Sequence, residues 1–104
     1  MNWIVRYIPE ALKDLESLDG SQRIIVRKAI EKVKVNPLPN DEGGYGKPLG
    51  HHSGANLTGL MKVKIKKEGI RIVYRLIRTD KSMEIIVIGA RKDDSVYKIA
   101  QKRM

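Results

Sequence analysis

Basic residues alternate with apolar ones along two neighbouring stretches of the chain. The cations at these positions are Lys62, Lys64 and Lys66, followed by Arg71 and Arg75. Because alternate residues of a β-strand face opposite sides of its sheet, each stretch would place its cations on one face and its apolar residues on the other. Rows of lysine and arginine on a sheet can bind an anion such as a phosphate group.

The density of positive charge in this region favours an anionic partner. Seven Lys or Arg residues and one acid lie between residues 62 and 78, a net charge of +6 within a whole-chain charge of +9. Like charges on adjacent strands destabilise a sheet, so a bound anion would relieve a cost that the free sheet carries. The alternative is a solvated face on which Lys and Arg only provide solubility. The arginines beside the lysines favour the anion site.

Three strands joined by short turns are predicted to carry these residues. Residues 60–66, 70–78 and 83–91 are rich in β-branched side chains, with turns at 67–69 and 79–82. This pattern is typical of an antiparallel meander. Residues 85–88 are apolar throughout, which predicts a central strand covered on both faces.

A strand and a helical hairpin are expected before the meander. Residues 2–8 are rich in β-branched and aromatic side chains, and Pro9 stops that strand and can open a helix over residues 10–18. Asp19 or Ser21 can cap a second helix, which ends before Pro37. The apolar stripe of this second helix is Val26, Ala29, Ile30 and Val33.

Residues 36–58 are expected to be the least ordered segment, since they hold three prolines and five glycines. A loop of this length is usually functional or mobile, and residues 47–49 could dock it on the sheet. His51 and His52 raise the possibility of a metal or acid–base site. No Asp, Glu or Cys shares a ligand spacing with them, so a polar pair in a flexible loop is the preferred interpretation.

The chain is expected to end in a short helix capped within residues 93–95. Its predicted apolar stripe is Val96, Ile99 and Ala100, with Tyr97 off the stripe. The predicted order is β-α-α-β-β-β-α. This is an α+β fold with an N-terminal strand, a two-helix hairpin, an antiparallel β-meander with a basic face and a short C-terminal helix.

The composition fits one small basic domain over residues 1–104. Such a domain points first to nucleic acid and then to an anionic membrane surface. No apolar run approaches the ~20 residues that span a bilayer, and the N-terminus lacks a signal-peptide pattern. The absence of Cys excludes a disulfide framework, a thiolate zinc site and a Cys nucleophile, and it fits a cytoplasmic protein.

Several short motifs are spread along the chain. They are Met61-Lys62-Val63-Lys64, Gly69-Ile70-Arg71-Ile72-Val73-Tyr74, Gly89-Ala90-Arg91, Val96-Tyr97 and Lys102-Arg103. Their order and spacing, with the early strand, the helical hairpin and Lys47-Pro48-Leu49, resemble the RelE/ParE superfamily of bacterial and archaeal toxins over nearly the whole chain. The lysine pair with Arg71, Arg91 and Tyr97 is similar to the RelE branch, whose members cut mRNA in the ribosomal A site.

This resemblance implies roles for particular side chains. The expected catalytic residues, matched to that branch by position, are Lys62, Lys64, Arg71, Arg91 and Tyr97. From the alternation of the first two strands of the meander, Lys62, Lys64, Arg71 and Arg91 are expected to converge on one concave, mostly exposed face of the sheet. The residues expected to contact RNA or the ribosome are Lys47, Lys66, Arg75, Lys102 and Arg103. Val96 stands where other branches carry a His before the tyrosine, and Ala90 replaces a basic residue of some relatives. Neither departure removes the lysine-type site.

The reaction that the resemblance implies is attack by a ribose 2′-hydroxyl on the adjacent phosphate, giving a 2′,3′-cyclic phosphate and a 5′-hydroxyl. It needs a base, cations for the charge on phosphorus and an acid for the leaving oxygen. A lysine flanked by cations has its charged form disfavoured, so Lys62 or Lys64 could be the base. Tyr97 could stack on a nucleotide base. The ribosome would position the substrate.

The expected function is therefore that of a type II toxin that cleaves translated mRNA and inhibits translation, without a cofactor. Its expected partners are a cognate antitoxin, the ribosome and mRNA, with no membrane and no metal. One alternative is a ParE-like toxin that binds DNA gyrase without nuclease activity. The other is a non-catalytic basic RNA-binding domain. The lysine pair favours the endonuclease, because a gyrase binder needs no such constellation.

Overall fold

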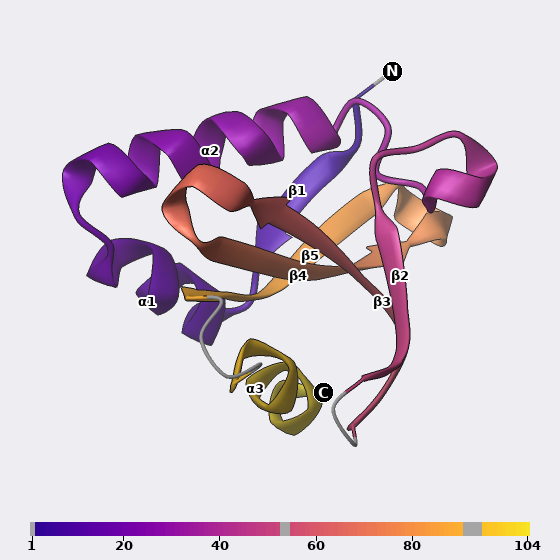
Figure 1. Cartoon of the computed structure of the whole chain (residues 1–104). Helices are drawn as coiled ribbons and strands as arrows, with labels where there is room; N and C mark the ends of the chain where they lie inside the picture. Colours follow the sequence, from indigo (N-terminus) through magenta and orange to yellow (C-terminus); the bar gives the residue numbers. More distant parts are fainter. Residues whose placement is uncertain (1, 53–54, 91–94) are drawn as a thin grey trace.

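Five strands of the described chain form one mixed sheet with helices on both of its faces (Figure 1). The computed structural model describes residues 2–52, 55–90 and 95–104. The strands are β1 (Ile4–Tyr7), β2 (Lys47–His52), β3 (Ala55–Ile65), β4 (Ile70–Ile77) and β5 (Ser82–Ala90). The α-helices of this part of the chain are α1 (Pro9–Ser17), α2 (Gly20–Val33) and α3 (Ser95–Arg103).

The spatial order of the strands is β1-β5-β4-β3-β2. Strands β3, β4 and β5 pair antiparallel, which confirms the predicted meander. The turn between β3 and β4 ends at Gly69, whose φ of 63° lies in the left-handed region that glycine adopts without strain. Strand β1 adds to the far side of β5 in parallel, so β5 lies inside the sheet.

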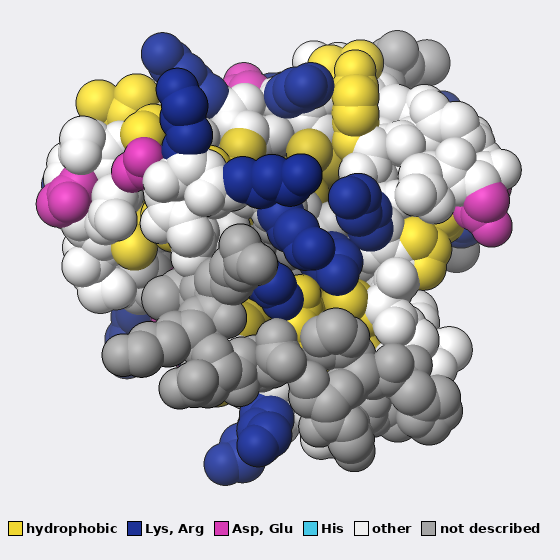
Figure 2. All heavy atoms as spheres, viewed as in Figure 1, with side chains coloured by type: hydrophobic (Ala, Val, Ile, Leu, Met, Phe, Trp, Pro, Cys, Tyr) yellow, Lys and Arg dark blue, Asp and Glu magenta, His cyan; other side chains and the backbone are white. Residues whose placement is uncertain are grey.

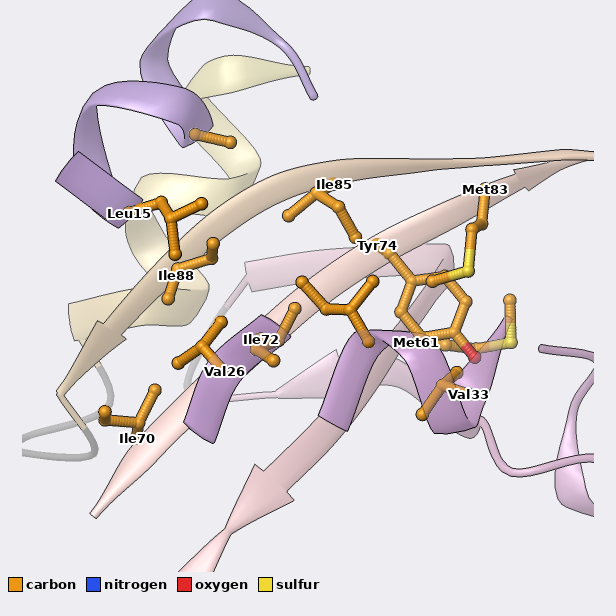
Figure 3. Close-up of a cluster of buried hydrophobic side chains, with 12 residues drawn as sticks. Leu15, Val26, Val33, Met61, Ile70, Ile72, Tyr74, Met83, Ile85 and Ile88 are labelled. Carbon is orange, nitrogen blue, oxygen red and sulfur yellow. The ribbon is translucent and has the colours of Figure 1, made fainter. Parts of the chain in front are cut away.

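The helices α1 and α2 pack on one face of the sheet and form the larger core (Figure 3). Asp19 caps α2 by accepting a hydrogen bond from the backbone N–H of Gln22 at 2.8 Å. The predicted stripe of α2 is confirmed, since Val26, Ile30 and Val33 are buried. The other face carries α3 and a second, smaller core.

A bulge in β5 places two consecutive side chains on the same face of the sheet. Val73 pairs with Val87 and Tyr74 with Ile85, which leaves Ile86 without a partner in β4. Ile86 and Val87 both pack in the core under α3, whereas Ile85 packs under α1 and α2. The prediction of a central strand covered on both faces is therefore confirmed.

Residues 36–46 belong to the segment that was predicted to be the least ordered, but hydrogen bonds hold them in place. The Tyr74 hydroxyl donates a hydrogen bond to the Pro37 carbonyl at 2.7 Å, and the Gly46 N–H donates to the Leu38 carbonyl at 3.0 Å. Tyr74 is fully buried, and burial raises the pKa of its phenol. Its hydroxyl needs an acceptor inside the protein, and the loop supplies one.

Strand β2 and the first half of β3 lie in a stretch that was predicted to be a loop. Lys47 pairs with Lys62, and Pro48 with Met61, before an irregularity shifts the register near Gly50. Glycine and proline lower local β-propensity, but pairing along β3 supplies the backbone hydrogen bonds. The side chains of His51 and His52 lie outside the described part, so their proposed role is not tested.

The apolar stripe predicted for α3 is wrong at two positions. Tyr97 is 0% exposed and Ile99 is 37% exposed, so Tyr97 and not Ile99 faces the sheet with Val96 and Ala100. A Cβ at Gly89 would lie 3.0 Å from Val96, which shows how closely α3 approaches β5. The expected helix cap at 93–95 lies outside the described side chains.

Candidate active site

Two pairs of cations face each other across neighbouring strands. Lys47 lies opposite Lys62 in the β2–β3 ladder, and Lys64 lies opposite Arg71 in the β3–β4 ladder. Cross-strand partners share a face, and Lys62 and Lys64 lie two positions apart in β3, so all four residues lie on one face of the sheet. This is the face that α3 covers, because Arg71 contacts Tyr97 of α3. The prediction that Lys62 and Arg71 share a face is confirmed. Among the described residues, no carboxylate forms an ion pair with Lys47, Lys62 or Lys64.

Tyr97 is the aromatic centre around which two of these cations gather. The Arg71 guanidinium donates a hydrogen bond to the Tyr97 hydroxyl. Its Cζ lies 5.2 Å from the centroid of the Tyr97 ring, and the Lys62 Nζ lies 5.9 Å from the same centroid. Both cations are within the range of cation–π attraction. The helix α3 therefore holds its tyrosine against the basic face of the sheet.

The cations differ in their exposure to solvent. Arg71 is only 8% exposed, which contradicts the expectation that the whole set forms a mostly exposed surface. Gly89 lies opposite Arg71 and lets α3 come close enough to cover it. Lys62 is partly buried and Lys64 is exposed. Arg91 lies outside the described residues, so its expected convergence on this site is not tested.

The surroundings of Lys62 lower the pKa of its ammonium group below the ordinary lysine value. Partial burial is the main cause, and the neighbouring charges of Lys64, Arg71 and Lys47 act in the same direction. Both effects disfavour the charged form of the side chain. Lys62 therefore loses its proton more readily than an ordinary lysine, which a general base requires.

A groove runs along the edge of β3 from Lys62, the last residue of β3 that pairs with β2, to Lys66. It has a volume of about 370 Å³ and is bordered by α2, by residues 45–47 and by β3. Its basic residues are Lys32, Lys47, Lys62, Lys64 and Lys66. Figure 2 shows Lys and Arg side chains gathered in the middle of this face, over β3, with acids at the margins of the view. No acid of the described chain lines the groove.

The remaining residues expected to bind RNA divide into two groups. Lys47, Lys66 and Lys102 are exposed. Arg75 forms an ion pair with Glu84 at 2.6 Å, and Arg103 binds Asp14 at 2.6 Å. Arg103 also donates to the Ile86 carbonyl at 2.9 Å. Both arginines therefore have acidic partners within the chain, and their expected contact with RNA stays a prediction.

Three residues near the site were not singled out from the sequence. Tyr45 and Lys32 line the groove, and their side chains contact each other, with the Lys32 Nζ 5.3 Å from the centre of the Tyr45 ring. Asp14 anchors α3 through Arg103. No local periodicity marks these positions, because the contacts join segments that are distant in the sequence.

The described residues contain neither a cluster of metal ligands nor a helix that could span a membrane. Among residues 2–52, 55–90 and 95–104, no group of three or more metal-binding side chains could hold a metal ion. No helix within those ranges is long and apolar enough to cross a membrane.

Comparisons with known proteins give a consistent result along the full length of the chain. No protein-family model matches it. An Escherichia coli protein named for its likeness to RelE toxins is 27% identical over 107 residues, with 100% of this chain and 99% of that protein covered.

The structure is similar to that of the E. coli toxin RelE. A free RelE variant with two arginines replaced by alanine has a TM-score of 0.78 at 23% identity, covering 100% of this chain and 99% of that one. RelE in the intact E. coli RelBE toxin–antitoxin complex has a TM-score of 0.64 at 22% identity, covering 85% and 95%. The resemblance drawn from the motifs and the predicted fold class are both confirmed.

Proposed function

We propose that this chain, RelE-like in sequence and in fold, is the toxin of a type II toxin–antitoxin system and cleaves mRNA on the ribosome. The observation that supports the proposal is the cluster of Lys62, Lys64 and Arg71 on the sheet face that carries Tyr97. Lys62 and Lys64 form no ion pair with a carboxylate of the described chain, so this cluster suits a phosphate that gains charge during the reaction.

In this mechanism Lys62 takes the proton from the ribose 2′-hydroxyl. Its lowered pKa increases the fraction of neutral amine that can accept a proton. The 2′-oxygen attacks phosphorus, the bond to the 5′-oxygen breaks, and that oxygen takes a proton from water, so that the products are a 2′,3′-cyclic phosphate and a 5′-hydroxyl. Arg71 and Lys64 stabilise the charge on the phosphate oxygens. By resemblance to the family, Arg91 adds a further donor.

Tyr97 has a positioning role in this scheme, because its ring is fully buried and the expected stacking of this ring on a nucleotide base is therefore wrong. Its hydroxyl accepts the hydrogen bond from Arg71, and its buried ring packs between α3 and the sheet. In-line attack requires the 2′-oxygen, the phosphorus and the leaving oxygen to be held in one line. A ribosome that holds the message in place supplies that orientation, which explains the proposed dependence on translation in the cytoplasm.

The proposed protein partner is a cognate antitoxin. RelE occurs bound to its antitoxin in the E. coli RelBE complex, and this chain shares the RelE fold. The unneutralised lysines would attract an acidic segment of the antitoxin. Affinity would then fall as salt is added, because the charges on the rim of the interface are screened.

The decisive experiment is primer extension on a translated message after brief expression of the toxin, with a gyrase supercoiling assay alongside. The parent should give ribosome-dependent cleavage, and Lys64→Ala and Arg91→Ala should each slow it by roughly 10²–10³. Lys13→Ala is the matched control, since Lys13 is exposed on α1, which packs on the other face of the sheet. Inhibited supercoiling without cleavage would replace this proposal with the ParE-like function. RNA binding with neither activity would favour the RNA-binding domain.

A further inference from the structure

Tyr45 stands at the border of the basic groove but outside the cluster around Tyr97. Its side chain is 50% exposed, and it lines the groove together with Lys62 and Lys64. The Lys32 Nζ lies 5.3 Å from the centre of its ring. The mechanism above gives this ring no task, and the described core does not bury it.

The backbone that carries Tyr45 is held in place from several sides. The Tyr45 N–H donates to the Asn36 carbonyl at 3.0 Å, and the Asn40 N–H donates to the Gly46 carbonyl at 2.7 Å. A Cβ at Gly44 would collide with the backbone of Leu38. The ring is therefore presented by a preorganised loop, so that little conformational freedom is lost when a ligand packs on it.

The groove beside this ring combines an apolar floor with a cationic rim. The apolar residues of its lining are Ala29, Val33, Val63 and Ile65, and the cations are the five lysines of the groove. The volume of about 370 Å³ lies within the range of ligand pockets, about 300–1,000 Å³. An aromatic ring next to a row of cations is the arrangement by which proteins bind single-stranded nucleic acid, with bases stacked on rings and phosphates on lysines.

We propose that Tyr45 is a stacking platform for an unpaired base of the RNA strand, next to the nucleotides that lie at Lys62, Lys64 and Arg71. The inference rests on the proposed function and adds the path of the strand. In this arrangement the RNA strand crosses the edge of β3 between Tyr45 and Lys64. Lys47 and Lys62 would bind the phosphates of its backbone.

Binding of a short uncleavable RNA tests this inference without any cleavage step. The probe is a fluorescent eight-nucleotide single strand with 2′-O-methyl riboses, measured by anisotropy against the full chain. Tyr45→Ala should weaken binding about 5- to 140-fold, the range expected from the loss of one stacked base. Tyr45→Phe should keep nearly the parent affinity because it keeps the ring. Ile24→Ala truncates an exposed apolar residue of α2 that does not line the groove, and it should leave the affinity for RNA unchanged.

A second probe separates stacking from charge. An abasic strand of the same length keeps every phosphate but offers no base to the ring. Tyr45→Ala should therefore bind the abasic strand as well as the parent does. An equal loss on both strands, or no loss on either, would overturn the stacking role. Tyr45-dependent binding of a polyglutamate peptide but not of RNA would also overturn it and indicate a protein ligand.

The outcomes for the two proposals are independent. If the parent cleaves mRNA on ribosomes but Tyr45→Ala binds the normal strand as the parent does, only the stacking inference fails. If Tyr45-dependent RNA binding is found and the parent cleaves nothing, the endonuclease proposal fails and the groove remains an RNA site. Thermal unfolding of each variant checks that it is folded, as the half-exposed position of Tyr45 leads us to expect.

Discussion

The guanidinium of Arg71 on β4 donates a hydrogen bond to the hydroxyl of Tyr97 on α3, a residue 26 positions further along the chain. This contact joins the basic face of the sheet to the helix that covers it. Both side chains are buried, so neither can change without affecting the other. The geometry of the proposed active site therefore depends on the docking of α3.

The first prediction concerns Tyr97→Phe. The change keeps the buried ring and its contacts with the cations but removes the oxygen that accepts the bond from Arg71. The free energy of unfolding should fall by about 1–3 kcal/mol, the usual cost of leaving a buried donor unsatisfied. Urea denaturation measures this loss, and single-turnover cleavage should also slow because Arg71 is less well oriented. A variant as stable as the parent would show that the hydroxyl is not needed to hold Arg71.

The second prediction concerns the dependence of cleavage on pH. Lys62 must be neutral to act as the base, and its pKa lies below the ordinary value of 10.5. The single-turnover rate should therefore rise with pH and level off before an ordinary lysine would titrate. Lys62→Arg keeps the charge but cannot supply a neutral amine, so the rise should disappear and the rate should drop by roughly 10² or more.

The comparison variant for that experiment is Lys13→Arg on α1, which should keep the pH profile of the parent. A profile for Lys62→Arg that still rises like the parent's would assign the base to another residue, with Lys64 the first to examine.

The third prediction is that the site reduces the stability of the free protein. Lys64 faces Arg71 across the β3–β4 ladder, and like charges in that arrangement repel. Lys64→Gln should raise the free energy of unfolding by about 0.2–1 kcal/mol at low salt and by less at high salt, while it slows cleavage. Lys66→Gln is the matched control, because the described ladder gives Lys66 no strand partner. A destabilised Lys64→Gln variant would contradict the repulsion.

The fourth prediction concerns the contact between α1 and α3. Asp14 accepts a hydrogen bond from Arg103 at 2.6 Å and from the backbone N–H of Ile88 at 3.1 Å. Asp14→Ala should lower the free energy of unfolding by about 1–3 kcal/mol, since it leaves a charged and a backbone donor without their acceptor. A double-mutant cycle with Arg103→Ala measures the coupling. Amide exchange in α3 should quicken in Asp14→Ala, and an additive cycle would rule out the coupling.

The sequence predicted those parts of the fold in which neighbours along the chain decide the structure. The spacing of Val26, Ile30 and Val33 correctly marked the buried side of α2, and alternation placed Lys62 and Arg71 on one face. The path of residues 36–46 was not predictable in this way, because a buried hydroxyl on the distant Tyr74 fixes it. The burial of Tyr97 was missed for a similar reason, since its partner Arg71 lies on a strand distant in the sequence.

In the candidate site, too, residues within short motifs were predictable, whereas contacts between distant segments were not. The motifs identified Lys62, Lys64, Arg71, Arg91 and Tyr97 as residues that work together. Among the described members of this set, Lys62 and Arg71 both lie against the ring of Tyr97. Tyr45 was missed because its neighbours in the chain are the glycines and prolines of a loop. Its closeness to Lys32 arises only when the loop returns to α2, so no pattern within one segment could reveal it.

The bulge at Ile86 also determines where the chain can lose a residue. Deletion of Ile86 would restore regular pairing and leave Ile85 and Val87 on the faces that they already occupy. Deletion of a paired residue such as Val73 would instead shift part of β4 to the opposite face. Among homologous chains, length variation within this part of the sheet should therefore be confined to the position of Ile86.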